Sequence, residues 1–365
     1  MNDRILATYR IAAPESEIRA RARALATEQS VEMPLTAIRE PHVLEEIVAT
    51  VEAIRPVDGE FEVVVGIAAS TTGYEASQLM NMIFGNCSMQ SEVRLLDATF
   101  PPGYTAHFPG PRFGIEGVRA ATGVQGRALT CSALKPQGAT LECHTALARS
   151  FTLAGIDVIK DDHGLTNQAF SPFARRVPAV QKVIDAANRE TGGNTLYAPT
   201  FSGGPAALAE QARIAKDCGV KMALVAPMLI GLPAFVEMVR EHFDVPVMAH
   251  PSFSGASRMA PTFLLGRLFR LFGADLIIFP NHGGRFSYTR ETCLAITAAA
   301  RAPWEGVRPS IVIPAAGMTV ERVDEMIGEY GRDILMLIGG GLLTAGDKLL
   351  ERGREFVTKV AACPA

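Results

Sequence analysis

The chain has 365 residues, a length that exceeds one minimal domain and allows a small domain followed by a larger one. Its formal net charge of −3 and its pI near 6.2 give no basic field that would attract nucleic acid or an anionic membrane. The six cysteines show no CxxC pairing, and no apolar run approaches the roughly 20 residues of a membrane-spanning helix, so we expect a cytoplasmic protein with reduced thiols.

The first hundred residues alternate between strand and helix patterns. In chain order, the expected elements are a strand at 4–11, a helix at 15–27, extended stretches at 46–54 and 61–68, a helix at 74–84 and a strand at 92–98. The order β-α-β-β-α-β is typical of a ferredoxin-like α+β unit.

A passage rich in proline and glycine, residues 101–111, interrupts this pattern before a new apolar run begins at Ala128. Such a change of composition indicates a domain boundary. We therefore expect a ferredoxin-like N-terminal domain with its linker at 1–125 and a catalytic domain at 126–365.

The second part of the chain repeats one pattern, in which a short apolar run precedes a longer helical stretch. The runs are 129–134, 158–160, 196–199, 223–227, 245–249, 276–279, 311–314 and 334–338. Eight such pairs within about 250 residues predict an α/β fold, a (β/α)8 TIM barrel. A doubly wound open sheet is the alternative.

Polar residues and glycines follow most of these runs. They are Lys135, Lys160 to His163, Thr200, His250, residues 280–285, Ala316 with Gly317, and Gly339 to Gly341. In a (β/α)8 barrel the chemistry takes place where strands end and the following loops begin. We therefore expect these residues to converge on one rim.

Two of the chain's few lysines, Lys135 and Lys160, stand at predicted strand ends. Arginine cannot replace lysine where a site needs an amine that loses its proton or forms a carbamate. The alternative for either residue is a lysine that merely extends from a strand end into water.

The segment Lys160-Asp161-Asp162-His163 combines two carboxylates and an imidazole. Strand alternation directs Lys160 and Asp162 to the same side. Oxygen ligands suit Mg²⁺, and a single imidazole also admits Mn²⁺. A free ammonium would repel the ion, so a metal site requires a modified or displaced Lys160. A strand-terminal cluster of ion pairs is the alternative.

The turns after the seventh and eighth runs match the usual phosphate site of such barrels, where backbone N–H groups hold the anion. Their candidate residues are Ala316, Gly317, Gly339 and Gly340. After the sixth run, Gly283 and Gly284 precede Arg285, an arrangement that fits a mobile lid carrying a cation. Ordinary connecting loops are the alternative for both features.

These residues resemble the RuBisCO superfamily and, within it, the RuBisCO-like proteins of form IV. The resemblance covers essentially the whole chain. Its marks are Leu134-Lys135-Pro136, the segment from Gly155 to Asp162, His250, and the glycines of the last two turns. It implies the barrel with its ferredoxin-like N-terminal domain, one Mg²⁺ held with CO₂ as a lysine carbamate, a phosphorylated small-molecule substrate and a homodimer.

The resemblance also implies roles for single residues. Lys160 is similar to the lysine that becomes the carbamate ligand, which would remove the repulsion of the cation. Asp162 would be the next metal ligand, and His163 stands where the family carries a glutamate. Lys135 resembles the lysine that transfers protons, and His250 resembles a histidine near the reacting carbons.

Further catalytic residues follow from the same resemblance. Arg285 occupies the place of the lysine on the lid loop. Glu28 and Asn86 resemble residues of the N-terminal domain that reach into the barrel of a neighbouring subunit, which implies active sites shared within a dimer.

Three departures separate this chain from the carboxylases. Gln137 replaces their second lysine, while Pro251 and Ile278 replace an arginine and a histidine that bind a second phosphate. The resemblance therefore implies a monophosphate substrate and no CO₂ fixation. An apolar pocket for the far end of the substrate would be supplied by Phe253, Ile278 and Phe279.

We thus expect Mg²⁺-assisted enolisation of a phosphorylated ketose, with 5-methylthioribulose-1-phosphate isomerase as the first choice. The alternatives are a 3-oxo-isoapionate-4-phosphate decarboxylase and a 2,3-diketo-5-methylthiopentyl-1-phosphate enolase, which has a lysine base where this chain has Asn86. A metal-independent Schiff-base aldolase and a catalytically silent relative remain open.

Overall fold

The computed structural model describes residues 3–363, and its contacts separate the chain into two units. The first unit comprises the chain up to Phe108 together with Phe253–Leu268. The second unit comprises Pro109–Ser252 and the chain from Phe269 onward. The domain division after residue 125 stays a prediction, and the structure adds that a later segment joins the first unit.

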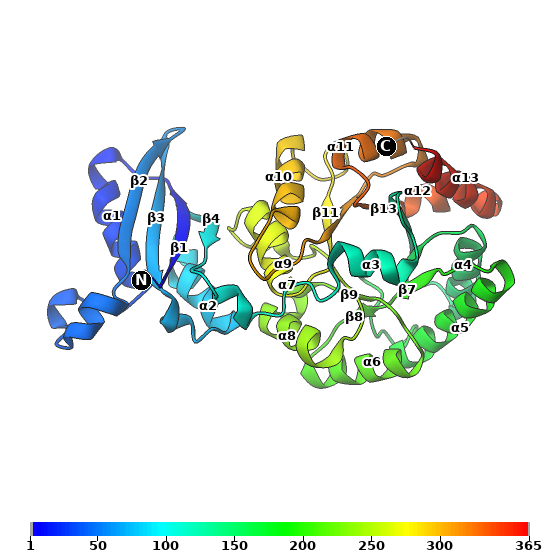
Figure 1. Ribbon diagram of the computed structural model, residues 1–365, viewed down its shortest axis with the longest axis horizontal. Helices are drawn as coiled ribbons and strands as arrows, with labels where there is room; N and C mark the ends of the chain where they lie inside the picture. Colours follow the sequence, from blue (N-terminus) through cyan, green and yellow to red (C-terminus); the bar gives the residue numbers. More distant parts are fainter. Residues whose placement is uncertain (1–2, 364–365) are drawn as a thin grey trace. The chain divides into compact units, whose positions relative to one another are not determined.

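The first unit contains an antiparallel sheet with the strand order β2-β3-β1-β4. Its elements are β1 Arg4–Ile11, α1 Glu15–Glu28, β2 Thr50–Val57, β3 Glu60–Ala68, α2 Ala76–Phe84 and β4 Val93–Thr99 (Figure 1). Along β1, buried residues alternate with partly buried ones, because only one face of the strand meets the core. This order of elements confirms the ferredoxin-like prediction.

One predicted strand of this unit begins later than expected. Instead of an extended stretch from residue 46, Val43–Ile47 forms a helical turn, and β2 starts at Thr50. The turn contains Leu44, Glu45 and Glu46, and leucine and glutamate both favour helical backbone. The prediction for 46–49 was therefore wrong.

The segment Phe253–Leu268 adds to the edge of the first unit beside β4. Leu95 receives a hydrogen bond from the Ala260 N–H at 2.8 Å and donates its own N–H to the Arg258 carbonyl at 3.0 Å. Arg267 pairs with Asp97 at 2.6 Å. Apolar residues of Thr262–Leu268, among them Phe263 and Leu265, are fully buried.

The second unit is a closed ring of parallel strands. Their bounds are β5 Leu129–Leu134, β6 Val158–Asp161, β7 Leu196–Ala198, β8 Thr200–Phe201, β9 Ala223–Val225, β10 Val247–Ala249, β11 Leu276–Pro280, β12 Ile311–Ala315 and β13 Leu335–Leu337. The two sheet orders are β13-β5-β6-β7 and β12-β11-β10-β9-β8. Pro199 separates β7 from β8. A β-bridge between Val312 of β12 and Ile334, the residue before β13, joins β12 to β13.

This ring confirms the (β/α)8 barrel and excludes the open sheet, because every strand has two neighbours once β7 and β8 are counted as one interrupted strand. Helices surround the ring in Figure 1. They are α4 Leu141–Leu153, α5 Phe173–Thr191, α6 Pro205–Asp217, α7 Pro227–Ile230, α8 Leu232–Glu237, α9 Phe269–Leu271, α10 Arg290–Arg301, α11 Val323–Tyr330, α12 Gly340–Leu343 and α13 Leu349–Ala362. Helix α3, Gly114–Thr122, instead lies across one end of the ring.

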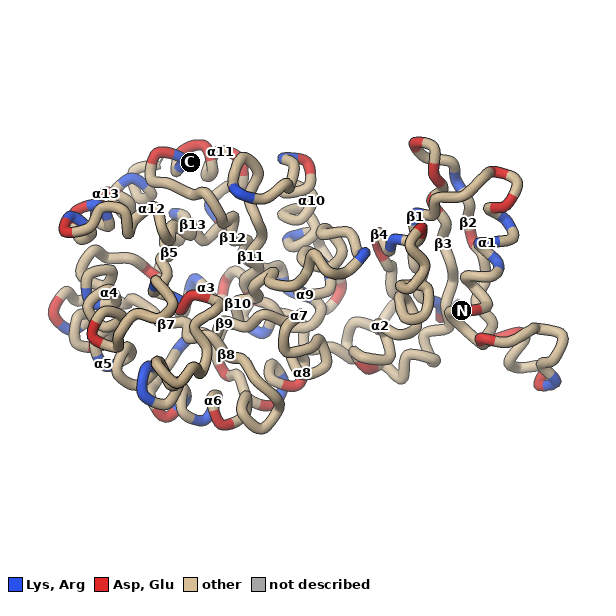
Figure 2. Tube along the Cα trace, turned by 180° about the vertical axis from the view of Figure 1, so that it is seen from behind, with Lys and Arg blue, Asp and Glu red and all other residues tan. Residues whose placement is uncertain are grey.

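Charged residues lie mainly on these outer helices and on the loops, as Figure 2 shows for the tube of the chain. No helix among residues 3–363 is both long and apolar enough to cross a membrane.

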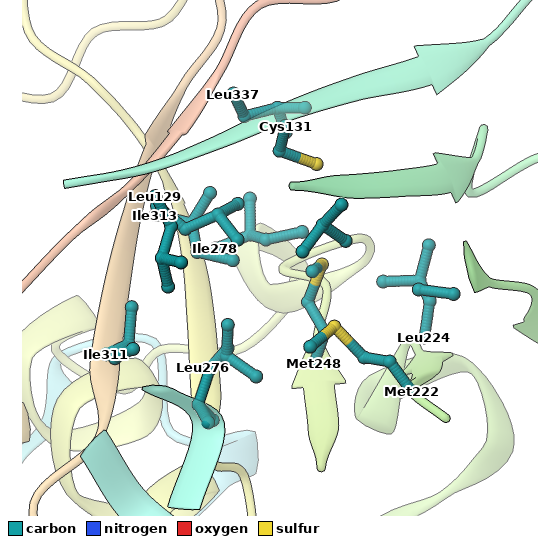
Figure 3. Packing of buried hydrophobic residues seen from close by; sticks show 14 of the residues in the cluster. Leu129, Cys131, Met222, Leu224, Met248, Leu276, Ile278, Ile311, Ile313 and Leu337 are labelled. Atoms are coloured by element: carbon teal, nitrogen blue, oxygen red, sulfur yellow. The ribbon is translucent and has the colours of Figure 1, made fainter. Parts of the chain in front are cut away.

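Apolar side chains fill the barrel (Figure 3). The interior cluster includes Leu129, Cys131, Met248, Leu276 and Ile278, all at most 2% exposed. Helix α3 closes one end, where its Val118 joins the same cluster. Because this end is filled, a site on the barrel axis has to lie at the carboxyl ends of the strands.

Candidate active site

Strand β6 directs Lys160 into the barrel. Val158 on the same strand belongs to the interior cluster, and alternation places Lys160 two residues later on the same side. The lysine is 2% exposed, and its Nζ donates to the Asp161 carbonyl oxygen at 2.8 Å. Burial is the main cause that lowers the Lys160 pKa, and the charge of Lys135 adds to it. The neutral amine is the form that reacts with CO₂, and Lys160 therefore loses its proton more readily than an ordinary lysine does.

Asp161 faces the opposite way and has a structural role. Its carboxylate lies 3.2 Å from an Arg176 nitrogen, and both side chains are fully buried. Asp161 also accepts hydrogen bonds from the Tyr197 hydroxyl at 2.7 Å and from the Thr200 N–H at 3.1 Å. These contacts tie β6 to α5 and to the interrupted third strand of the barrel, so Asp161 is not available to a ligand.

Asp162 joins two basic side chains at the mouth of β6. Its Oδ2 lies 2.7 Å from Lys135 Nζ, and its Oδ1 lies 3.2 Å from His163 Nδ1. Burial opposes ionisation of Asp162, but hydrogen bonds from His163 and Lys135 outweigh it and hold the pKa well below its ordinary value. Asp162 is thus a carboxylate, as a cation ligand has to be.

Two imidazoles stack beside this carboxylate. The rings of His163 and His250 lie 4.2 Å apart with an interplanar angle of 11°. His250 Nδ1 accepts the N–H of Ser252 at 3.2 Å, so its neutral ring carries the proton on Nε2. Burial, followed by the charges of Lys160 and His163, lowers the His250 pKa well below its ordinary value. His250 therefore offers a neutral N–H donor.

Ser252 belongs to the site although the sequence patterns did not predict it. Its hydroxyl lies 2.9 Å from His250 Nδ1. Ser252 stands two residues after His250, and this spacing is the only sequence signal that could have identified it. Thr200, which the sequence placed at the rim, donates its hydroxyl to the Asp162 carbonyl at 3.1 Å and fixes the end of β6.

The predicted phosphate turns lie at the ends of β12 and β13. Ala316 and Gly317 adopt positive φ angles of 68° and 83°. Gly339 precedes α12, and a Cβ on it would lie 3.7 Å from Lys135 Cε. The β13 turn is therefore next to the Lys135 side chain, while the turn with Ala316 contacts the loop after β11.

That contact involves Gly284, the residue before Arg285. A Cβ on Gly284 would collide with the Ala316 carbonyl oxygen, and a Cβ on Gly317 would lie 3.0 Å from Gly284 Cα. Only glycine permits this approach. Arg285 itself lies over the Phe286 ring, with its guanidinium carbon 5.9 Å from the ring centre.

In the first unit, Glu28 and Asn86 form a direct pair. The Asn86 side-chain amide donates to Glu28 Oε1 at 2.9 Å. Asn86 begins the turn Asn86–Met89, and Glu28 ends α1. The structure thus brings these two predicted residues together within their own unit.

The apolar pocket expected from Phe253, Ile278 and Phe279 needs a correction. Ile278 belongs to the barrel interior, but Phe279 points the opposite way and packs against Tyr330 of α11 with ring centres 5.9 Å apart. Adjacent residues of a strand face opposite sides, so these two cannot line one pocket. Phe253 belongs to the first unit and is 63% exposed.

The residues around Lys160 suit a divalent cation once the lysine is modified. Asp162 supplies an ionised carboxylate, His163 supplies an imidazole, and a carbamate on Lys160 would supply the missing anionic oxygen. Within residues 3–363, His282, Glu325 and Glu329 are the one unmodified group whose geometry suits a metal. Glu325 and Glu329 are already paired with Arg322 and Arg290.

Comparison with known proteins gives a consistent result. The sequence pattern of the family described as "Ribulose bisphosphate carboxylase large chain, catalytic domain" matches residues 114–346. The chain is 50% identical over 364 residues to 5-methylthioribulose-1-phosphate isomerase of Rhodospirillum rubrum, covering 99% of this chain and 97% of that protein. It is 34% identical over 309 residues to 2,3-diketo-5-methylthiopentyl-1-phosphate enolase of Geobacillus kaustophilus, covering 82% and 75%.

Solved structures that resemble this chain belong to the same group of proteins. The Rubisco-like protein from Rhodopseudomonas palustris matches with a TM-score of 0.92 and 46% identity, covering 99% of this chain and 98% of that one. A dimeric archaeal Rubisco from Hyperthermus butylicus matches with a TM-score of 0.91 and 25% identity, covering 99% and 91%.

Proposed function

This chain belongs to the family of the ribulose bisphosphate carboxylase large chain, and we propose that it is a RuBisCO-like isomerase of 5-methylthioribulose 1-phosphate that fixes no CO₂. One observation carries the proposal. Lys135 at the end of β5 and Lys160 and Asp162 at the end of the neighbouring strand β6 form one cluster, next to a neutral His250. The cluster therefore combines a base, Lys135, an anionic ligand, Asp162, and an amine that can be modified, Lys160. Enolisation of a ketose requires these three kinds of group.

The family typically uses Mg²⁺ with a carbamylated lysine, and the proposal assigns that site to three residues. A carbamate on Lys160, the Asp162 carboxylate and the His163 imidazole would hold one Mg²⁺. When bound, the cation stabilises negative charge on the oxygens of the enolised substrate.

The protein's own groups move the protons. Lys135, whose side chain is 36% exposed, reaches the mouth of the barrel and is the proposed base at the carbon beside the ketone. The same amine returns the proton to the former carbonyl carbon, and a second enolisation of this kind moves the carbonyl one carbon further. The carbonyl then lies next to the carbon that bears the thioether, which gives the methylthioxylulose phosphate with no net loss of atoms. The Nε2–H of His250 would donate to a substrate oxygen, and Arg285 would supply a cation from the loop after β11.

A single phosphate is proposed to bind the backbone N–H groups of Ala316, Gly317, Gly339 and Gly340. The second phosphate site of the carboxylases has no counterpart, because Pro251 has no cationic side chain and Ile278 is part of the apolar barrel core. This difference supports a monophosphate substrate with an uncharged far end.

A homodimer is the proposed active unit, in which the paired Glu28 and Asn86 would enter the barrel of the partner subunit. The six cysteines are all free, which supports the reducing cytoplasm as the protein's location.

The direct test offers the purified protein, with Mg²⁺ and bicarbonate, three substrates in parallel. They are 5-methylthioribulose 1-phosphate, 2,3-diketo-5-methylthiopentyl 1-phosphate and 3-oxo-isoapionate 4-phosphate. We expect conversion of the first to a methylthioxylulose phosphate, followed by phosphorus NMR. Turnover of only the second or only the third would replace the proposal by the enolase or the decarboxylase.

Two controls accompany this assay. Lys160→Ala should be inactive, whereas Lys182→Ala, which removes an exposed lysine on α5, should retain full activity. Borohydride reduction in the presence of substrate should leave the protein unmodified. A substrate adduct on Lys135 or Lys160 would instead support the Schiff-base aldolase.

A further inference from the structure

The loop after β11, residues 281–289, starts from a buried and fully bonded asparagine. Asn281 is 0% exposed, and its N–H donates to the Ala315 carbonyl at 2.8 Å. Its Oδ1 accepts the Tyr330 hydroxyl at 2.5 Å, and its Nδ2 lies 3.1 Å from Met326 Sδ. The base of the loop is therefore fixed to β12 and α11.

The next anchor is a single carboxylate on α11. Glu329 is 7% exposed, and its Oε2 lies 2.6 Å from His282 Nε2. Its other oxygen, Oε1, pairs with Arg290 Nε. His282 stands at the start of the loop, and Arg290 is the first residue of α10. One side chain thus holds both ends of the loop.

Holding both ends restricts the positions that the loop can take. A chain from His282 to Arg290 could span about 27 Å if it were extended. Because both residues meet the same carboxylate, residues 283–289 form a closed loop with adjacent ends. Gly284 within it lies against Ala316 and Gly317, and Arg285 follows directly.

A metal ion is the competing interpretation, because His282, Glu325 and Glu329 have suitable geometry. Their charges are, however, already compensated. Arg290 pairs with Glu329, and Arg322 pairs with Glu325 at 2.7 Å. A cation would have to displace both guanidinium groups, so the cluster fits a network of ion pairs.

We propose that Glu329 is a positioning residue for Arg285: by anchoring His282 and Arg290 it holds the loop where Gly284 contacts the Ala316–Gly317 turn. The role assigned to Arg285 rests on the proposed function, but the anchoring itself does not. Glu329 acts through the loop and does not touch the substrate.

The first experiment measures hydrogen exchange of the amides at 283–289 by mass spectrometry. Glu329→Ala should raise their exchange rates about tenfold, and Glu329→Gln, which keeps a hydrogen-bonding group, should raise them less. Asp324→Ala is the matched control, because Asp324 lies on the same helix but is 64% exposed and pairs with Lys359. Exchange in β5 and β6 should stay unchanged in all variants, which shows that the barrel is folded.

The second experiment measures kcat and KM with 5-methylthioribulose 1-phosphate. Glu329→Ala should raise KM and lower kcat, Glu329→Gln should restore much of both, and Asp324→Ala should match the wild type. Unchanged exchange at 283–289 in Glu329→Ala would overturn the anchoring. Faster exchange with unchanged kinetics would overturn the role in positioning Arg285. If the wild type itself is inactive while exchange responds as expected, the proposed function fails and the anchoring stands.

Discussion

His163 is the residue that would distinguish the proposed metal site most clearly from one built only of carboxylates. Its Nδ1 lies 3.2 Å from Asp162, and its ring stacks on His250 at 4.2 Å. The imidazole therefore has a defined position beside the carboxylate. Nitrogen ligands shift the preference of a site from Mg²⁺ toward ions such as Mn²⁺.

This chemistry leads to a prediction about the metal. In His163→Glu, an oxygen ligand replaces the imidazole, so the activity with Mg²⁺ relative to Mn²⁺ should rise about tenfold. The measurement is the ratio of kcat/KM values with each ion at saturation. An unchanged ratio would mean that His163 does not contact the cation.

The two lysines at the rim are predicted to have separable roles. Lys160→Ala should abolish both Mg²⁺ binding and turnover. Lys135→Ala should retain Mg²⁺ binding but lose proton transfer, with kcat lowered at least about 10²-fold. Calorimetric titration with Mg²⁺ in the presence of bicarbonate distinguishes the variants. Loss of binding in Lys135→Ala would contradict this division, because Lys135 would then be needed to hold the site together.

At the scale of elements, one buried carboxylate, that of Asp275, holds the first residues of α3 in place. Asp275 Oδ1 accepts the N–H groups of Phe113 and Gly114, both at 2.8 Å, and Oδ2 accepts that of Val247 at 2.9 Å. Burial outweighs these bonds and raises the Asp275 pKa from 3.8 to about 6. The contribution of this anchor of α3 to the stability of the protein therefore depends on pH.

The sign of this coupling gives a prediction. Between pH 4 and 6 the native state keeps a proton that the unfolded chain has released, so the contribution of Asp275 to stability decreases as the pH rises. Across this window the free energy of unfolding of the wild type should fall by about 2–3 kcal/mol relative to Asp275→Asn. Urea unfolding of both proteins measures the difference. A difference that does not depend on pH would refute the coupling.

Local patterns predicted the elements well where each element is regular. The bounds of β1 and β5 agree with the sequence prediction, because hydrophobic periodicity is a property of the segment itself. The pairing of Phe253–Leu268 with β4 was not predictable in this way, since Arg258 bonds to Val93 across 165 residues of sequence. The sequence contains no local signal for such a partner.

The candidate site, too, was predictable only where local patterns decide the position of a residue. Strand alternation predicted that Lys160 and Asp162 face the same side, and the resemblance supplied their roles. The bond from Ser252 to His250 and the Glu329 anchor were not predicted, because they depend on how separate segments meet. Phe279 was assigned to the wrong side of β11, although the alternation of strand residues places it opposite its neighbour Ile278.

At the scale of the whole molecule, the proposed sharing of residues between subunits predicts complementation. Glu28→Ala and Lys160→Ala should each be inactive alone. If Glu28 serves the partner's barrel, a mixed dimer regains one intact site, so equal mixing should restore about a quarter of wild-type activity. The measurement is activity after the two variants are dissociated and reassociated together. No recovery in a mixture with demonstrated heterodimers would contradict shared sites.

We propose that this protein enolises a ketose monophosphate through a carbamylated, metal-bound Lys160. The most direct test follows proton NMR of 5-methylthioribulose 1-phosphate in deuterated water, with Mg²⁺ and with or without bicarbonate. We predict deuterium exchange at the carbon beside the ketone, accompanied by isomerisation, only when both Mg²⁺ and bicarbonate are present and never with Lys160→Ala. Absence of exchange in the complete mixture, or equal exchange with Lys160→Ala, would contradict the claim.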